Sequence, residues 1–167
     1  MQWPEQFYAW RAGRGCPACA EGRPDETGAG VRWFAGACCD AYLVRAGIQR
    51  GLTIAVFRGR HVAEPTELTA TEAAAYGGEV LQVARAIEAA FAPVKLNYDV
   101  LGNSVPHLHT HIVPRYADDP RPGWPFPFPD PDPPPLPAER LQADLAALRR
   151  ALTTRSRAAR ARPARAP

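Results

Sequence analysis

Residues 105–115 read Val-Pro-His-Leu-His-Thr-His-Ile-Val-Pro-Arg, and they hold three of the four histidines of the chain. His107, His109 and His111 alternate with a leucine and a threonine, which is the pattern of a β-strand because successive side chains of a strand point to opposite faces. With a rise of about 3.3 Å per residue, the three imidazoles would share one face at intervals of roughly 7 Å. The stretch therefore predicts a strand that carries the imidazoles on one face and packs its other face in the core.

A row of three imidazoles has few purely structural explanations. Imidazole changes its charge near neutral pH and serves as a base, a nucleophile or a metal ligand. Clustered imidazoles cost free energy unless some of them stay neutral or bind a metal. The row therefore marks a functional site.

Length and charge limit the class of protein. The 167 residues suffice for one domain, no apolar run reaches the length of a membrane span, and no signal peptide is visible, so we expect a cytoplasmic protein without membrane contact. The net charge of +3 is uneven, because residues 149–167 hold seven arginines and no acid. The rest is mildly acidic, which disfavours a nucleic-acid-binding domain. We expect the arginine-rich end to be a solvated tail that does not bind nucleic acid.

Short apolar runs with glycine-containing connections predict strands on both sides of one long helix. A capping box at Thr69 to Glu72 begins this amphipathic helix, and Pro93 ends it. The expected strands cover residues 31–34, 41–44, 52–57, 94–101 and 108–113. Because helix and strands are segregated along the chain, the fold class is α+β with a five-stranded antiparallel sheet.

Both ends of the chain differ in composition from this middle part. Residues 2–11 are rich in aromatic side chains and are expected to form a short helix against the sheet. Residues 120–137 hold ten prolines interleaved with Trp124, Phe126 and Phe128, and are expected to form an extended arm on the body or on a neighbouring subunit. The expected organisation is a main domain over residues 1–117, a proline-rich arm over 118–138, a C-terminal helix over 139–153 and a disordered basic tail over 154–167.

The four cysteines do not form a plausible disulfide framework in a cytoplasmic chain of this size. Cys16 and Cys19 make a Cys-x-x-Cys pair, whose spacing suits two ligands of a tetrahedral zinc ion. A redox pair or two incidental buried thiols are the alternatives. Cys38 and Cys39 adjoin an expected strand and are interpreted as small buried residues.

The chain resembles the histidine triad (HIT) family of nucleotide hydrolases and transferases in three features. These are the histidine row, the two apolar residues that follow it and the turn Gly102-Asn103-Ser104-Val105 before it. The resemblance spans roughly residues 16–116 and implies a HIT-like catalytic domain over 1–117. It implies that His109 attacks the α-phosphorus of a nucleotide and forms a covalent nucleotidyl-histidine, which water then hydrolyses. This chemistry suits imidazole, which is partly neutral at pH 7 and splits one difficult displacement into two easier ones.

The same resemblance implies the other contacts to the substrate. His111 is expected to donate to the phosphate or to the leaving group. Ser104 and Asn103 are expected to hydrogen-bond phosphate oxygens, and Asn97 corresponds to a further phosphate-contacting position. For Asn103 and Asn97, a plain role in the turn or at the strand end is an equal alternative.

The chain also resembles the zinc-containing, diadenosine polyphosphate hydrolase-like branch of the family. His61 stands between the third expected strand and the helix, as its family counterpart does. The resemblance implies a structural zinc ion, because all four ligands would come from the protein. The implied ligands are Cys16, Cys19, His61 and His107.

Two positions depart from the family pattern. The acidic residue that binds the ribose hydroxyls in the hydrolase branch is replaced by Arg45. Either Arg45 contacts the base or an additional phosphate, or the nearby Asp40 serves in its place. The uridylyltransferase branch has glutamine at the position of His111, so water is the expected final acceptor here.

The resemblance thus implies a hydrolase of a nucleotide phosphoanhydride or phosphoramidate, such as a dinucleoside polyphosphate or adenosine phosphoramidate. A homodimer is expected because the family usually pairs two subunits. One alternative is a nucleotide-binding regulatory module with negligible turnover. The other is a zinc-catalysed hydrolase in which His107, His109 and His111 themselves bind the metal.

Overall fold

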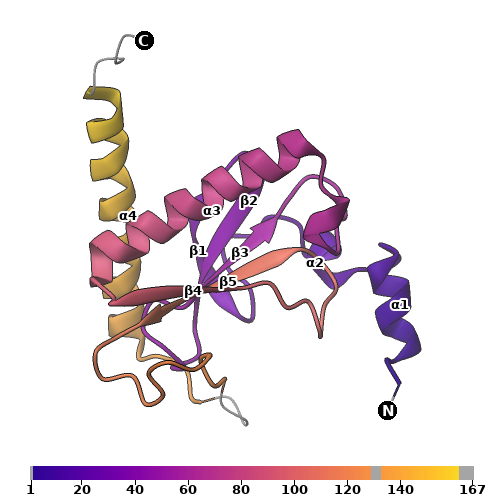
Figure 1. The fold of residues 1–167 in the computed structure, drawn as a ribbon, viewed down its shortest axis with the longest axis horizontal. Coiled ribbons are helices and arrows are strands. Elements are labelled where there is room, and N and C mark those ends of the chain that lie inside the picture. The colour runs from indigo at the N-terminus through magenta and orange to yellow at the C-terminus, as the bar shows by residue number, and fades with distance from the viewer. Residues whose placement is uncertain (1, 129–132, 162–167) are drawn as a thin grey trace.

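Five antiparallel strands form one sheet in the order β1-β2-β3-β5-β4 (Figure 1). The structure is a computed structural model that describes residues 2–128 and 133–161, with side chains up to residue 154. The strand bounds are β1 Gly30–Ala35, β2 Cys39–Val44, β3 Thr53–Phe57, β4 Lys95–Asp99 and β5 His109–Arg115. The expected α+β fold with a five-stranded antiparallel sheet is confirmed, and β5 lies between β3 and the edge strand β4.

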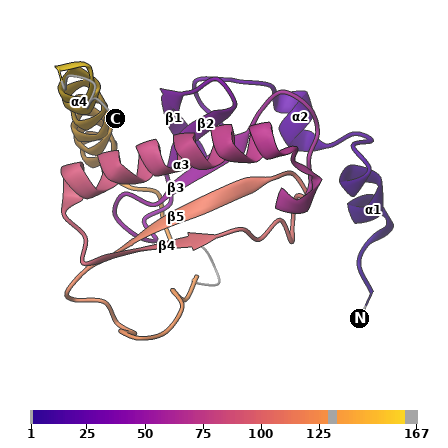
Figure 2. The same ribbon diagram turned by 45° about the horizontal axis from the view of Figure 1, so that its top comes forward.

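The long helix α3, Ala70–Phe91, lies across one face of the sheet (Figures 1 and 2). It begins with the expected capping box, in which Thr69 Oγ1 accepts from the Glu72 N–H and the Glu72 carboxylate accepts from the Thr69 N–H. The helix ends at Ala92, which has a left-handed φ of 47°, directly before Pro93. The side chains that α3 buries are Tyr76, Val80, Val83, Ala84, Ala86, Ile87 and Phe91.

Alternation along β5 separates the two faces of the sheet. Ile112 belongs to the core under α3, and Thr110 Oγ1 is 2.9 Å from the hydroxyl of Tyr76 on that helix. His109 and His111 therefore point to the opposite face.

The C-terminal helix α4, Ala138–Ala161, packs beside α3 and against β1 (Figure 2). It is longer than the expected helix over 139–153 and continues to Ala161, into the stretch expected to be a disordered tail. The reason is that alanine and arginine have high helix propensities and no proline interrupts this segment. Residues 162–167 of the expected tail lie outside the described residues. No helix in the described ranges is both long and apolar enough to cross a bilayer.

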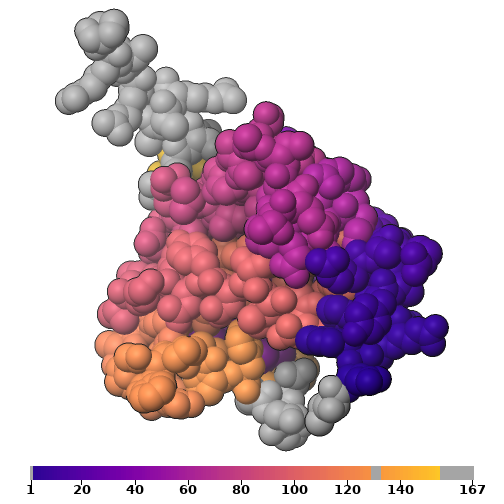
Figure 3. Space-filling model, turned by 45° about the vertical axis from the view of Figure 1, so that its right-hand side comes forward, coloured from indigo at the N-terminus to yellow at the C-terminus, as the bar shows by residue number. Residues whose placement is uncertain are grey.

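Three short helical segments precede α3 and complete the body: α1 Glu5–Arg11, α2 Pro17–Glu21 and the 3-10 helix η1 Pro65–Glu67. The expected packing of the aromatic α1 segment against the sheet is wrong, because this helix buries none of its residues. Its aromatic side chains contact each other instead, with the rings of Trp3 and Phe7 stacked at 4.4 Å. In Figure 3 the N-terminal segment (indigo) and the first part of the arm (orange) lie on opposite sides of the chain that leads into β5.

The arm lies on the body of its own chain, on the sheet face opposite α3. Phe126 packs against a second apolar cluster made of Val44, Leu52 and Val113. After the gap in the described residues, the Gly47 N–H donates to the Pro134 carbonyl at 3.0 Å, and the Leu136 N–H donates to the Arg45 carbonyl at 2.7 Å. The arm is thus attached to the sheet on both sides of that gap.

Candidate functional site

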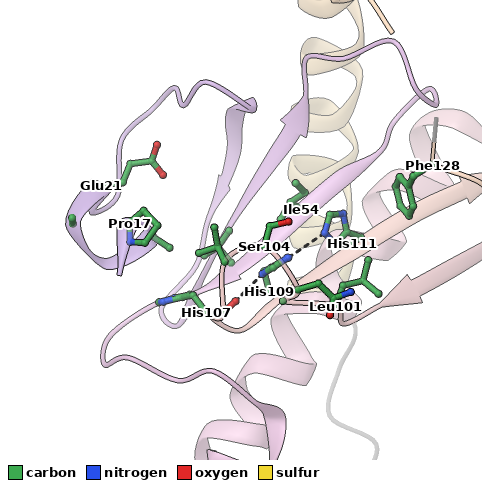
Figure 4. A pocket seen from close by; sticks show the side chains of 15 residues that line it. Pro17, Glu21, Ile54, Leu101, Ser104, His107, His109, His111 and Phe128 are labelled. Carbon is green, nitrogen blue, oxygen red and sulfur yellow. Dashed lines mark hydrogen bonds between the residues drawn. The ribbon is translucent and has the colours of Figure 1, made fainter. Parts of the chain in front are cut away.

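A cleft of about 820 Å³ lies on the sheet face opposite α3, between α2 and the arm (Figure 4). Strands β3 and β5 form its floor, and the segment between β4 and β5 forms one side. The residues that line it are Pro17, Ala18, Ala20, Glu21, Ile54, Val56, Leu101, Gly102, Asn103, Ser104, Val105, His107, His109, His111 and Phe128. All three histidines of the row therefore reach the same cleft.

His109 and His111 are joined by a hydrogen bond between their Nε2 atoms, which are 3.1 Å apart (Figure 4). The Nδ1 atom of His109 lies 2.7 Å from the carbonyl oxygen of His107. A carbonyl can only accept, so this network assigns the proton of a neutral His109 to Nδ1. Nε2 of His109 is then unprotonated, and its lone pair accepts from the Nε2–H of His111. The arrangement presents His109 Nε2 as a nucleophile on the floor of the cleft.

The surroundings of His111 keep its ring neutral. Burial is the larger cause and the neighbouring His109 the smaller cause that lower the pKa of His111 to about 4. Its Nδ1 atom is buried and has no hydrogen-bond partner among the described residues, which suits an unprotonated nitrogen. At pH 7 His111 is therefore a neutral donor through Nε2–H.

The lowered pKa of His111 predicts a loss of stability in acid that His111→Gln should reduce. An unfolded histidine with a pKa of 6.5 takes up its proton before a folded one with a pKa of about 4, so the folded state loses stability as the pH falls from 6.5 toward 4. At pH 5 this loss amounts to at most about 2 kcal/mol. Thermal unfolding at pH 7 and pH 5 should show a smaller decrease in Tm for His111→Gln than for the wild type. Both proteins keep the same cysteines, so acid effects there cancel, and equal decreases would contradict the prediction.

The turn before β5 presents Asn103 and Ser104 to the cleft. Gly102 has a φ of 71°, a left-handed conformation that glycine adopts without steric cost, and it directs the next two residues outward. Both side chains are exposed and line the cleft beside His109. Their hydroxyl and amide groups can donate to phosphate oxygens there.

Asn97 is not brought to this cleft. It lies on β4, and its Oδ1 accepts a hydrogen bond from the Arg115 guanidinium at the far end of β5. Asn97 and Arg115 line a separate cavity together with Trp124. The structure therefore places Asn97 beside the arm and away from the predicted nucleophile.

A second cluster brings together the four predicted metal ligands. One sulfur or nitrogen atom from each of Cys16, Cys19, His61 and His107 lies within 4.8 Å of all the others. The His107 Nδ1 atom is 3.6 Å from Cys16 Sγ and 3.4 Å from Cys19 Sγ, and the His61 Nδ1 atom is 3.4 Å from Cys19 Sγ. Zinc bonds of about 2.3 Å to sulfur and 2.0–2.1 Å to nitrogen at tetrahedral angles separate the two ligand atoms by about 3.5 Å. The four side chains fit a zinc ion.

Backbone carbonyls fix the orientation of both histidines in this cluster. The Nε2 atom of His107 lies 2.8 Å from the Phe57 carbonyl, and that of His61 lies 3.2 Å from the Arg11 carbonyl. Each Nε2–H therefore donates to a carbonyl and leaves Nδ1 unprotonated toward the cysteines. Such an outer hydrogen bond is typical of histidines that bind metals.

Neither candidate for the ribose contact lies in the cleft. Arg45 forms an ion pair with Glu26 at the end of β2. Asp40 is fully buried and bound by Arg58 at 3.0 Å and by Arg23 at 2.7 Å. Both side chains have structural partners, and neither is among the residues that line the cleft.

The sequence did not identify the apolar lining of the cleft or its carboxylate. Ile54 and Val56 form part of the floor, and Glu21 and Phe128 stand at opposite ends. The aromatics of the arm were a visible signal in the sequence. Their spacing alone does not tell which of them reaches the histidines.

Comparison with known proteins agrees with this fold. Residues 49–118 match the family model described as HIT domain. A histidine triad protein from Bradyrhizobium japonicum is 27% identical, with a TM-score of 0.64, and the match covers 74% of this chain and 91% of that one. A histidine triad protein from Marinobacter aquaeolei is 28% identical, with a TM-score of 0.65 and coverage of 75% and 90%. Residues 49–118 are therefore similar in sequence to HIT domains, and the fold is similar to that of histidine triad proteins.

A third solved structure shares the fold over more of the chain. It is a zinc-bound histidine triad family protein from Mycobacterium smegmatis, 21% identical, with a TM-score of 0.56 and coverage of 92% of this chain and 96% of that one. A search of curated proteins gave no match.

Proposed function

We propose that this protein hydrolyses a nucleotide derivative through a covalent intermediate on His109. The observation that carries the proposal is the orientation of this ring, because the His107 carbonyl holds Nδ1–H at 2.7 Å and leaves the Nε2 lone pair in the cleft. The HIT domain match, in a family that includes nucleotide hydrolases and transferases, supports the same chemistry.

The proposed reaction has two displacements at the α-phosphorus. In the first, His109 Nε2 forms a bond to phosphorus while the bond to the leaving group breaks, and the leaving group takes a proton from water in the open cleft. The positive charge that develops on the His109 ring is stabilised by the His107 carbonyl, which accepts from Nδ1–H. His111 Nε2–H, no longer bound to His109, together with Ser104 and Asn103 donates to the phosphate oxygens. In the second displacement, water adds to phosphorus, its spare proton passes to solvent, and the bond to His109 breaks.

The charges of the cleft favour a phosphoramidate over a polyphosphate substrate. Glu21 carries the one formal charge among the described residues that line the cleft, and no lysine or arginine is among them. A polyphosphate leaving group would bring several negative charges toward this carboxylate without a cation to pair with. An amine leaving group, as in adenosine phosphoramidate, avoids that repulsion, so a dinucleoside polyphosphate is the less favoured substrate.

The proposal includes a structural zinc ion on Cys16, Cys19, His61 and His107. The distances between these ligand atoms and the zinc-bound structure from Mycobacterium smegmatis support it. Bound zinc would stabilise two thiolates and hold the N-terminal segment against the start of β5. His107 would then serve twice, since its ring binds the metal and its carbonyl orients His109.

The two alternative functions, a zinc-catalysed hydrolase and a regulatory module, require different arrangements of the histidine row. A catalytic zinc on the row itself needs three converging rings, but the ring of His107 turns to the cysteines while the other two bind each other. This geometry disfavours the zinc-catalysed hydrolase. A regulatory module would use the same cleft, and only kinetics separate it from an enzyme.

The test is an acid-quenched single-turnover reaction with adenosine phosphoramidate, and in parallel with a diadenosine polyphosphate, each labelled at the α-phosphorus. We expect label to be trapped on the protein and to appear in the monophosphate product, with faster transfer from the phosphoramidate. Tight nucleotide binding without trapped label or turnover would favour the regulatory module.

We also propose a homodimer that forms at the edge strand β4. Among the described residues this strand pairs only with β5, so its other edge is open to a strand of a second copy. The apolar side chains of Val94 and Tyr98 beside that edge are exposed by 70% and 44%. Sedimentation velocity of the wild type and Tyr98→Asp would test the proposal, and a monomeric wild type would contradict it.

A further inference from the structure

Phe128 on the proline-rich arm stands beside the histidines of the cleft. Its ring centroid is 5.8 Å from that of His111, in an edge-to-face arrangement (Figure 4). The side chain lines the cleft, and 39% of Phe128 is exposed. Its ring is therefore available to a molecule bound over the floor.

The position of Phe128 is fixed by the part of the arm that precedes it. Phe126 contacts Phe128 edge to face at 5.6 Å and is itself packed on the apolar cluster that includes Val113. The guanidinium of Arg115 lies over the ring of Phe126, 5.6 Å from its centroid. Phe128 is thus supported by a packed aromatic side chain and a cation.

Arg115 also ties the arm to the end of β5. It is 6% exposed, donates to the Trp124 carbonyl at 2.9 Å and to the Arg121 carbonyl at 3.1 Å, and binds the carboxylate of Asp119. The Oδ1 atom of Asn97 accepts another of its hydrogen bonds. Arg115 is therefore a positioning residue for the arm, and Asn97 acts on the arm through it.

The cleft has two ends that differ in chemistry. His109, Ser104 and Asn103 mark the place of the phosphate. Beyond His111, the cleft is bounded by Ile54 and the ring of Phe128. The ring centroids of His109 and His111 are 5.0 Å apart and those of His111 and Phe128 are 5.8 Å apart, so the three rings follow one another from the place of the phosphate toward the arm. The other end of the cleft is lined by small residues and by the Glu21 carboxylate. A negative charge there suits an amine leaving group.

We propose that Phe128 contacts the base of the bound nucleotide and makes the proline-rich arm a specificity element of the cleft. The inference rests on the proposed function, since the position of the phosphate at His109 sets the position of the base. Aromatic side chains stack favourably on every nucleobase, because each base has a π-face.

The test compares two ligands on the full-length chain by calorimetry. Adenosine 5′-monophosphate carries the base, whereas ribose 5-phosphate has the same sugar and phosphate without it. We expect Phe128→Ala to weaken binding of the monophosphate about tenfold and to leave ribose 5-phosphate unchanged. Phe128→Trp should restore or strengthen binding of the monophosphate.

The matched control is Trp124→Ala, which removes a 65% exposed aromatic side chain from the same arm but outside this cleft. It should leave both affinities unchanged. Equal weakening of both ligands by Phe128→Ala, unchanged or tighter binding of the monophosphate, or no binding by the wild type would each overturn the proposal.

The inference and the proposed function fail in different ways. If label is trapped on the wild type but Phe128→Ala has no effect on the monophosphate, the function stands and the role of Phe128 is refuted. If neither trapped label nor turnover is seen and the affinities still change as expected, the contact with the base stands and the hydrolase is refuted.

Discussion

His109→Ala should lower turnover of adenosine phosphoramidate by at least about a thousandfold and remove all label trapped on the protein. The imidazole is the group that bonds to phosphorus, and nothing else on the floor of the cleft can replace it. Its neighbour His111 has a different role in the proposed reaction, in which its Nε2–H donates to the phosphate and forms no bond to phosphorus. Rapid-quench kinetics of the two proteins, with scintillation counting of the protein fraction, would measure the loss.

The control for this prediction is Ser104→Ala, which removes a donor to the phosphate but keeps the nucleophile. It should slow the transfer by about tenfold and still trap label on the chain. Binding of adenosine 5′-monophosphate and the Tm of both variants would verify that the fold and the cleft persist. Turnover that survives in His109→Ala would refute the covalent mechanism.

The histidine row shows which part of the site could be predicted from sequence periodicity. The period of two placed His109 and His111 on one face of β5, as observed. It also predicted that His107 shares this face, but His107 lies before the first residue of the strand, and its ring turns toward the cysteines. Alternation defines faces only within a strand, so the division between a metal-binding ring and two reacting rings had to come from the family resemblance.

The position of the arm on the body could not be predicted from sequence periodicity. Its prolines predicted an extended segment, but its path is set by distant partners, such as the buried guanidinium of Arg115 and the apolar patch under Phe126. These contacts join residues from separate elements, and no local pattern encodes them. For the same reason the sequence assigned Asn97 to the phosphate, while the structure bonds it to Arg115.

For the last part of the C-terminal helix, amino-acid composition predicts disorder, whereas local helix propensity predicts helix. Arginine, alanine and proline together predicted disorder from residue 154. Proline stands only beyond the helix, however, and the preceding alanines and arginines favour helix. The buried leucines at 141, 145 and 148 fix the first turns on the core, and the rest propagates from them.

Cys16→Ser should release zinc and lower the Tm by about 10 °C or more. Cys16 is 2% exposed, and its sulfur lies 3.6 Å from the Nδ1 atom of His107. In the absence of a metal, the pKa of the neighbouring Cys19 is raised to about 11, first by desolvation and then by the hydrogen bond to Cys16. Bound metal would therefore supply the charge that keeps the Cys19 sulfur as a thiolate, and that binding free energy is available only to the folded chain. Metal analysis and calorimetric unfolding would measure both effects.

The matched control for the zinc prediction is Cys38→Ser, which changes a thiol outside the cluster and keeps a hydrogen bond to Glu79. It should retain one zinc per chain and the wild-type Tm. A chelator should lower the Tm of the wild type and of Cys38→Ser toward that of Cys16→Ser, and should not affect Cys16→Ser further. Because the His107 carbonyl orients His109, zinc loss should also slow transfer to His109 more than it weakens nucleotide binding. Unchanged metal content and Tm in Cys16→Ser would show that the four side chains do not hold a structural ion.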